Sequence, residues 1–231
     1  KPLYDALHCH VRAKLNEHYG DEVVSNSGPL PVHLLGNMWG QSWSNIYDLV
    51  YTEQSKSNSV DVTKIINDKE IDEIEMVEYA EDFFISIGFE PLPSTFWERS
   101  LFVKPRDRAV VCHASAWNLD PANNDLRIKM CIQRNEEDFI TIHHELGHIF
   151  YYQAYNHLPT LFQGGANDGF HEAFGDLLTL SITPDYLTQI NFISEDEASL
   201  AKEDPIGLLM KQALEGVVVV PWALMLDKWR S

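Results

Sequence analysis

The stretch IHHELGH at residues 142–148 largely decides how this sequence is interpreted. It contains the pattern H-E-x-x-H as His144, Glu145 and His148, inside a segment whose periodicity predicts a helix over about 136–155. Residues four apart on a helix lie on one face, so the two imidazoles can bind one metal ion. Glu145 is rotated off that face and can reach a metal-bound water without taking a ligand position. The pattern therefore indicates a hydrolytic zinc site with a general base.

A second segment offers the third protein ligand that catalytic zinc usually takes. Glu172 follows His148 by 24 residues and lies in a second predicted helix, over about 168–182. Turn-forming residues over 158–165 predict that the two helices are antiparallel. Asp176 lies four residues after Glu172 on the same face, where it can accept the spare N–H of a ligating histidine. The alternative for Asp176 is an ordinary surface carboxylate.

Two more histidines, His143 and His171, adjoin the candidate ligands. Successive residues of a helix point about 100° apart, so neither shares a face with its neighbour. Both are expected to be structural. The alternative for the whole motif is a helix that carries surface histidines, and the second acidic segment weakens that alternative.

The rest of the chain reads as mostly helical with one small β-hairpin. A helix over 3–19 with one apolar face is predicted by the four-residue spacing of Leu3, Leu7, Val11 and Leu15. A second amphipathic helix over 72–87 is predicted by the spacing of Ile74, Val77, Phe84 and Ile87. A further helix is expected over about 203–219. The hairpin is expected from two apolar runs, 109–117 and 126–132, which flank a turn-rich segment.

The three cysteines are Cys9, Cys112 and Cys131, and no C-x-x-C motif is present. The hairpin would place Cys112 and Cys131 near the same rung of the ladder. A disulfide there is plausible and would contribute roughly 3 kcal/mol in the chain-entropy description. Two reduced strand cysteines are the alternative. The number of cysteines alone does not decide the compartment.

Composition excludes several classes of protein. Lys and Arg number 17 and Asp and Glu 35, so the formal charge is 17 − 35 = −18, and no basic cluster is present. No nucleic-acid partner is therefore expected. The longest apolar run, 217–226, is interrupted by Pro221 and is shorter than the roughly 20 residues of a spanning helix. We therefore expect no membrane-spanning segment. The first residues resemble neither an initiator methionine nor a signal peptide, so we expect a piece of a longer chain.

Several longer strings resemble the angiotensin-converting enzyme family of zinc peptidyl-dipeptidases. They are LLGNMW with WSNIYDL within 34–49, CHASAW at 112–117, HHELGHI at 143–149, and GAN, GFHEA and GD within 165–176. The similarity runs from about Leu3 to Arg230. It implies a mainly α, zincin-like zinc-metallopeptidase fold with a small β-hairpin, incomplete as given. Residues 1–231 would be the central part of one peptidyl-dipeptidase catalytic domain.

The resemblance also implies a set of site residues. His144, His148 and Glu172 match the family's ligands for one Zn²⁺, and Glu145 matches its general base and acid. Positions that match substrate-binding groups are His113, the backbone of Ala114 on the edge of the hairpin, and Gln41. Positions that match a disulfide pair are Cys112 and Cys131. Cys9 matches no family cysteine.

The implied activity is release of C-terminal dipeptides from peptide substrates. The implied location is extracellular, either secreted or anchored to a membrane through a segment outside this chain. Chloride is expected only in a full-length parent, because the family's chloride ligands lie outside this span. In the family pattern the residues that stabilise the oxyanion and complete the carboxylate pocket lie past Ser231, so this chain alone is expected to lack essential residues.

Two alternative functions are open. The first is an inactive homologue or fragment that binds zinc or peptide without turnover. The second is a zinc peptidase of the aminopeptidase type, which would need a G-x-M-E-N string that the sequence lacks.

Overall fold

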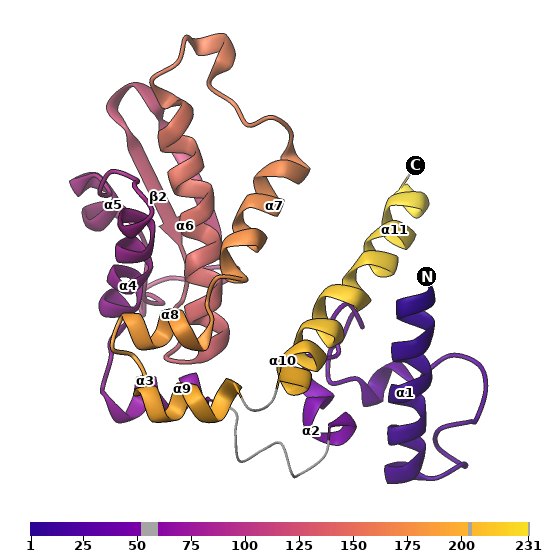
Figure 1. Ribbon diagram of the computed structural model, residues 1–231. Helices are drawn as coiled ribbons and strands as arrows, with labels where there is room; N and C mark the ends of the chain where they lie inside the picture. Colours follow the sequence, from indigo (N-terminus) through magenta and orange to yellow (C-terminus); the bar gives the residue numbers. More distant parts are fainter. Residues whose placement is uncertain (52–59, 203–204, 231) are drawn as a thin grey trace. The chain divides into compact units, whose positions relative to one another are not determined.

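The computed structural model describes residues 1–51, 60–202 and 205–230 (Figure 1). The chain forms two compact units, one of residues 1–60 with 199–231 and the other of residues 61–198. The described elements are helices apart from one two-stranded antiparallel sheet. The predicted mainly α fold with a small β-hairpin is therefore confirmed.

The larger unit is built around one long helix, α6 (Glu136–Asn156), which the sequence predicted to within one residue. Asn135 caps this helix by accepting a hydrogen bond from the backbone N–H of Asp138, and three acidic residues in the first turn suit the positive end of the helix dipole. The other described helices of this unit are α3 (Val62–Asp68), α4 (Glu73–Ser86), α5 (Ser94–Arg99), α7 (Asp168–Thr179), α8 (Pro184–Gln189) and the first residues of α9 (Glu195–Lys202).

Helix α6 packs against α4, α7 and the hairpin (Figure 1). Aromatic side chains hold the contact between α4 and α6, and the rings of Phe84 and Phe150 stack with their centroids 4.3 Å apart. Both side chains are fully buried. Truncating such a side chain typically costs about 3–5 kcal/mol, so this contact contributes to the stability of the larger unit.

Part of the predicted apolar pattern of α4 is wrong. Ile74 and Ile87 were expected on the core side, but both are exposed. The core side instead carries Val77 and Phe84, as expected, together with Met76, Ala80 and Phe83.

The hairpin joins β1 (Ser115–Asp120) to β2 (Asp125–Lys129), with Ser115 opposite Lys129. A short 3₁₀ turn, η4 (Pro121–Asn123), connects the strands. Both strands are shorter than predicted. The segment after β2 leaves β1 because the backbone N–H groups of Met130 and Ile132 donate instead to the carbonyls of Leu101 and Phe102.

A disulfide joins Cys112 to Cys131, with their Cα atoms 5.1 Å apart, and Cys9 is exposed and free. The predicted pairing is confirmed. The bond ties the segment before β1 to the segment after β2, where the ladder itself has ended.

Replacing both bonded cysteines with serine should lower the free energy of unfolding by about 3 kcal/mol, since the bond closes a loop of this size. The sequence separation of the two cysteines is 19 residues. Urea titration of the wild type and of the double variant measures the loss, and a Cys9→Ser variant should show none. Peptide mapping without reduction should recover one linked pair. Recovery of both residues as thiols from protein secreted into oxidising medium would contradict the assignment.

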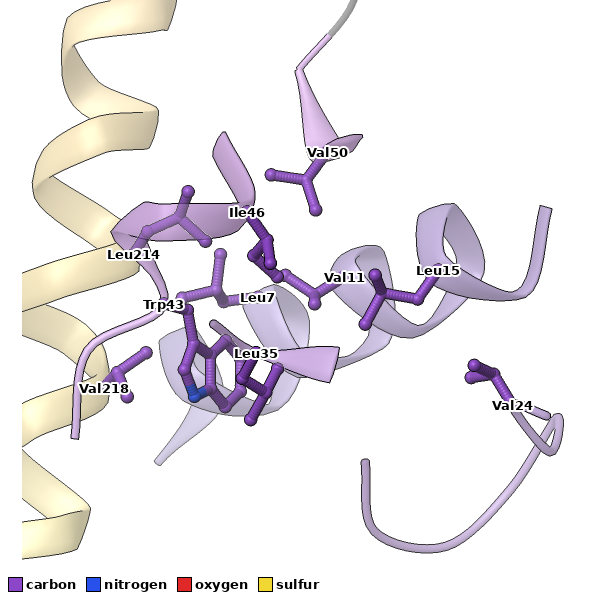
Figure 2. Close-up of a cluster of buried hydrophobic side chains, with 10 residues drawn as sticks. All are labelled: Leu7, Val11, Leu15, Val24, Leu35, Trp43, Ile46, Val50, Leu214 and Val218. Atoms are coloured by element: carbon purple, nitrogen blue, oxygen red, sulfur yellow. The ribbon is translucent and has the colours of Figure 1, made fainter. Parts of the chain in front are cut away.

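The smaller unit packs its N-terminal helix against the C-terminal helical segment. Its elements are α1 (Pro2–Tyr19), η1 (Val32–Leu34), η2 (Ser44–Ile46), α2 (Tyr47–Val50), α10 (Pro205–Gln212), the π-helical η6 (Ala213–Val217) and α11 (Val218–Arg230). Leu7, Val11 and Leu15 lie along the buried face of α1, as predicted (Figure 2), whereas Leu3, predicted on the same face, is exposed. Trp43 joins this core, and its backbone N–H donates to the carbonyl of Leu214 at 2.8 Å.

The predicted end of the C-terminal helix is wrong. We expected it to stop near residue 219, but it continues through Pro221 to Arg230. The turn before the proline is the π-helical η6, and its wider geometry gives room for the proline ring. In the described residues the segment Ile206–Arg230 is one helix of 25 residues, and an 18-residue window within it has a mean hydropathy of 1.4. By length and composition it could cross a membrane, against the expectation drawn from the sequence. One such helix is weak evidence, since core helices have the same composition.

Candidate metal centre

Three predicted ligands meet between α6 and α7. The Nε2 atoms of His144 and His148 are 3.1 Å apart, and Oε2 of Glu172 lies 3.2 Å from the first and 3.5 Å from the second. Zinc bonds of roughly 2.0–2.1 Å in a tetrahedral arrangement put neighbouring ligand atoms about 3.3 Å apart. The three separations therefore fit one tetrahedral zinc ion, with a position left for a fourth ligand.

Two glycines allow this convergence. A Cβ atom on Gly147 of α6 would lie 3.0 Å from the Cα of Gly175 on α7, and one on Gly175 would lie 2.7 Å from Nδ1 of His144. The backbones of the two helices therefore approach more closely than a side chain at either position would allow. This close approach brings the carboxylate of Glu172 within reach of the imidazoles of both His144 and His148.

Asp176 lies beside the first of these imidazoles, with its Oδ1 3.1 Å from Nδ1 of His144. Because Nε2 of His144 faces the other ligand atoms, its Nδ1 is the nitrogen that carries the proton and donates to Asp176. That tautomer leaves the Nε2 lone pair free for a metal. Burial lowers the pKa of His148, which favours the neutral imidazole that a metal requires.

Glu145 is set apart from the three ligands. Its side chain is buried, and Oε2 has no hydrogen-bond partner among the described residues. Burial raises the pKa of Glu145 to about 7; His144 opposes the rise and the carboxylate of Glu172 adds to it. A buried carboxyl group with a free oxygen and a pKa near neutrality is suited to taking up and returning a proton.

The predicted substrate-binding residues lie in different parts of the chain. His113 and Ala114 belong to the larger unit, directly between the disulfide at Cys112 and the start of β1, and His113 is exposed. Ala114 was expected on the edge of the hairpin and lies one residue before the strand. Gln41 belongs to the smaller unit, and its Oε1 is buried without a hydrogen-bond partner among the described residues.

The neighbouring histidines differ from each other. His143 is fully buried, its Nδ1 donates to the carbonyl of Phe139 at 2.8 Å, and burial lowers its pKa to about 4. His171 instead reaches the metal centre, with its Nδ1 2.6 Å from Nδ1 of His148. Sequence reasoning missed this contact because it tested only which residues share a helix face. Gly147 and Gly175 were the available signal for this contact. Two glycines at facing positions let the helices approach closely, so that His171, next to Glu172 on one helix, can reach the ring of His148 on the other.

A model of a peptidase family described as angiotensin-converting enzyme matches residues 1–231. The chain belongs to the angiotensin-converting enzyme family. The angiotensin-converting enzyme of Bos taurus is 47% identical over 232 residues, which is all of this chain and 18% of that protein. That of Sus scrofa is 47% identical over 233 residues, all of this chain and 17% of that protein. That of Haematobia irritans exigua is 45% identical over 236 residues, all of this chain and 37% of that protein.

This result confirms the resemblance drawn from the sequence and places the chain in a metallopeptidase family. The chain spans less than two fifths of the length of each of these three angiotensin-converting enzymes. The described residues of this family member contain one group of histidine and acidic side chains able to hold a metal ion, and that group is His144, His148 and Glu172.

Proposed function

We propose that the chain is the central part of a peptidyl-dipeptidase catalytic domain that hydrolyses peptides with one Zn²⁺ held by His144, His148 and Glu172. The observation that carries the proposal is the convergence of the three ligand atoms at 3.1–3.5 Å. The donor set also fits zinc by chemistry, since two imidazoles and one carboxylate with an open fourth position are typical of catalytic zinc. When bound, zinc would acidify a water molecule and polarise the scissile carbonyl.

The residues of the chain would supply the remaining steps. Glu145 takes the proton of the attacking water and returns it to the leaving amine. Its burial keeps the carboxyl group away from competing hydrogen bonds. Asp176 holds His144 in the metal-binding tautomer.

The remaining roles follow the family pattern. His113 and the backbone of Ala114 would hold the backbone of the substrate near the scissile bond, and Gln41 would help to bind its C-terminal carboxylate. The partners would be peptides. The Cys112–Cys131 bond is compatible with an extracellular protein, either secreted or membrane-anchored.

An inactive homologue or fragment is the second candidate. The 231 residues taken alone match 18% of the length of the Bos taurus protein. In the family pattern the groups that stabilise the oxyanion lie outside this span. Removing even one such donor commonly costs about 10²–10³ in rate.

The test compares the 231-residue chain with the protein made from the full reading frame that contains it. Both are assayed at matched zinc concentration on an N-terminally blocked tripeptide. The full protein should release the C-terminal dipeptide, identified by mass spectrometry, and the 231 residues alone should show negligible kcat/KM. Release of a single C-terminal or N-terminal amino acid would contradict the dipeptidase assignment. Zinc binding by both proteins without any product would favour the inactive homologue.

A further inference from the structure

We propose that His171 is a positioning residue for the metal centre and fixes the tautomer and orientation of His148 by accepting a hydrogen bond from its Nδ1–H. The inference rests on the proposed zinc function. His171 would then do for His148 what Asp176 does for His144. The partner of His148 is a neutral imidazole, whereas that of His144 is a carboxylate.

The contact between the two rings requires one donor and one acceptor. The Nδ1 atoms of His148 and His171 are joined by a hydrogen bond and lie 2.6 Å apart, so one of them carries the proton and the other accepts. Nε2 of His148 faces Nε2 of His144 at 3.1 Å and Oε2 of Glu172 at 3.5 Å, so this nitrogen must offer a lone pair to the shared ion. A neutral imidazole with a lone pair on Nε2 carries its proton on Nδ1. Nδ1 of His171 is therefore the acceptor, and the proton of His171 resides on its Nε2.

The surroundings of His171 keep its ring in this position. The ring centroids of Tyr151 and Tyr152 lie 4.6 Å and 4.8 Å from that of His171. A Cβ atom on Gly165 would lie 3.0 Å from Cδ2 of His171, so the loop before α7 closes on the ring as well. A ring confined on several sides holds its acceptor nitrogen in one place, which a positioning role requires.

The other nitrogen of His171 argues against a role in packing alone. Nε2 is buried and has no hydrogen-bond partner among the described residues. A buried N–H without a partner is unfavourable, and phenylalanine would fill the same space without that cost. The imidazole at this position is therefore explained by the bond that its Nδ1 makes to His148, because packing would be served better by an apolar ring.

Two variants separate positioning from packing in the protein made from the full reading frame. His171→Phe keeps a planar ring but removes the acceptor. His171→Asn keeps an acceptor oxygen at nearly the distance of Nδ1 from the backbone. Zinc affinity, measured by competition with a chromophoric chelator, should fall about 10–100-fold in His171→Phe and should be largely restored in His171→Asn.

Two spectroscopic measurements do not depend on turnover. In the cobalt(II)-substituted protein, each ligating imidazole gives a strongly shifted N–H proton signal. The His148 signal should disappear through solvent exchange in His171→Phe and persist in His171→Asn, whereas the His144 signal should persist in both. In the zinc-loaded wild type, long-range ¹H–¹⁵N correlations should show Nδ1–H for His148 and Nε2–H for His171, which needs no variant.

Each result decides the inference. Unchanged zinc affinity with both N–H signals present in His171→Phe would overturn it, as would the opposite tautomers in the wild type. If His171→Phe and His171→Asn lost zinc equally, the ring would matter for packing only, and the inference would fail. These outcomes leave the proposed function intact, provided that the wild type binds zinc and releases dipeptide. A wild-type protein that binds no zinc would instead refute the proposed function itself.

Discussion

Replacing Glu145 with glutamine should leave zinc bound and lower kcat by about 10²–10⁴-fold, the usual contribution of a general base. The glutamine amide has nearly the shape of the carboxyl group, but it cannot take up a proton near neutral pH. Glu145 is not one of the three residues whose ligand atoms converge, so replacing its carboxyl group should not disturb the metal ligands. The measurement is kcat on a blocked tripeptide, together with the zinc content of the same preparation.

Two matched substitutions complete this experiment. Glu172→Gln should lose zinc, because a neutral amide is a poorer ligand than a carboxylate. Glu137→Gln changes an exposed glutamate on the same helix, α6, and should affect neither zinc nor kcat. Equal loss of zinc in Glu145→Gln and Glu172→Gln would show that the roles of base and ligand are wrongly assigned.

Replacing Gly175 with alanine should weaken zinc binding by about 10²-fold or more. This loss exceeds the roughly 10–100-fold loss of metal affinity that is usual when a residue supporting a ligand is removed. The added Cβ would lie 2.7 Å from Nδ1 of His144, a separation that requires movement. Either the ring of His144 turns away from Asp176, or α7 moves away from α6 and takes Glu172 with it. Both movements remove a ligand from the centre.

Gly164→Ala is the control for this prediction, since a Cβ atom there would meet no heavy atom within 4 Å. It should bind zinc like the wild type. Competition with a chelator gives the zinc affinities of both variants. Thermal unfolding followed by circular dichroism checks that both variants are folded. A folded Gly175→Ala protein with wild-type zinc affinity would refute the account of the close helix approach.

The helices that carry the candidate metal centre were predictable because their signals are local. His144 and His148 are one helical turn apart, and a residue spacing of four fixes their relative direction without reference to the rest of the fold. The capping residue Asn135 and the apolar pattern that follows it set the start of α6 in the same way. The predicted hairpin made a Cys112–Cys131 bond plausible and the family resemblance implied it, and the structure places both cysteines just outside the two paired strands.

The features that were missed depend on contacts between distant segments or on the unusual geometry of one turn. The segment after β2 leaves β1 because the backbone N–H of Met130 donates to the carbonyl of Leu101, which is 29 residues earlier in the chain. The C-terminal helix was predicted to end near residue 219, and only the π-helical turn before Pro221 shows why it continues. His171 was missed because its contact with His148 depends on how closely α7 approaches α6.

The zinc content of the protein made from the full reading frame tests the central claim most directly. The wild type and a His144→Ala/His148→Ala double variant are purified in parallel, equilibrated with trace zinc and analysed by inductively coupled plasma mass spectrometry. The account predicts one zinc per chain in the wild type and none above background in the double variant. Zinc retained at one per chain by a folded double variant would contradict the claim that His144, His148 and Glu172 form the metal centre.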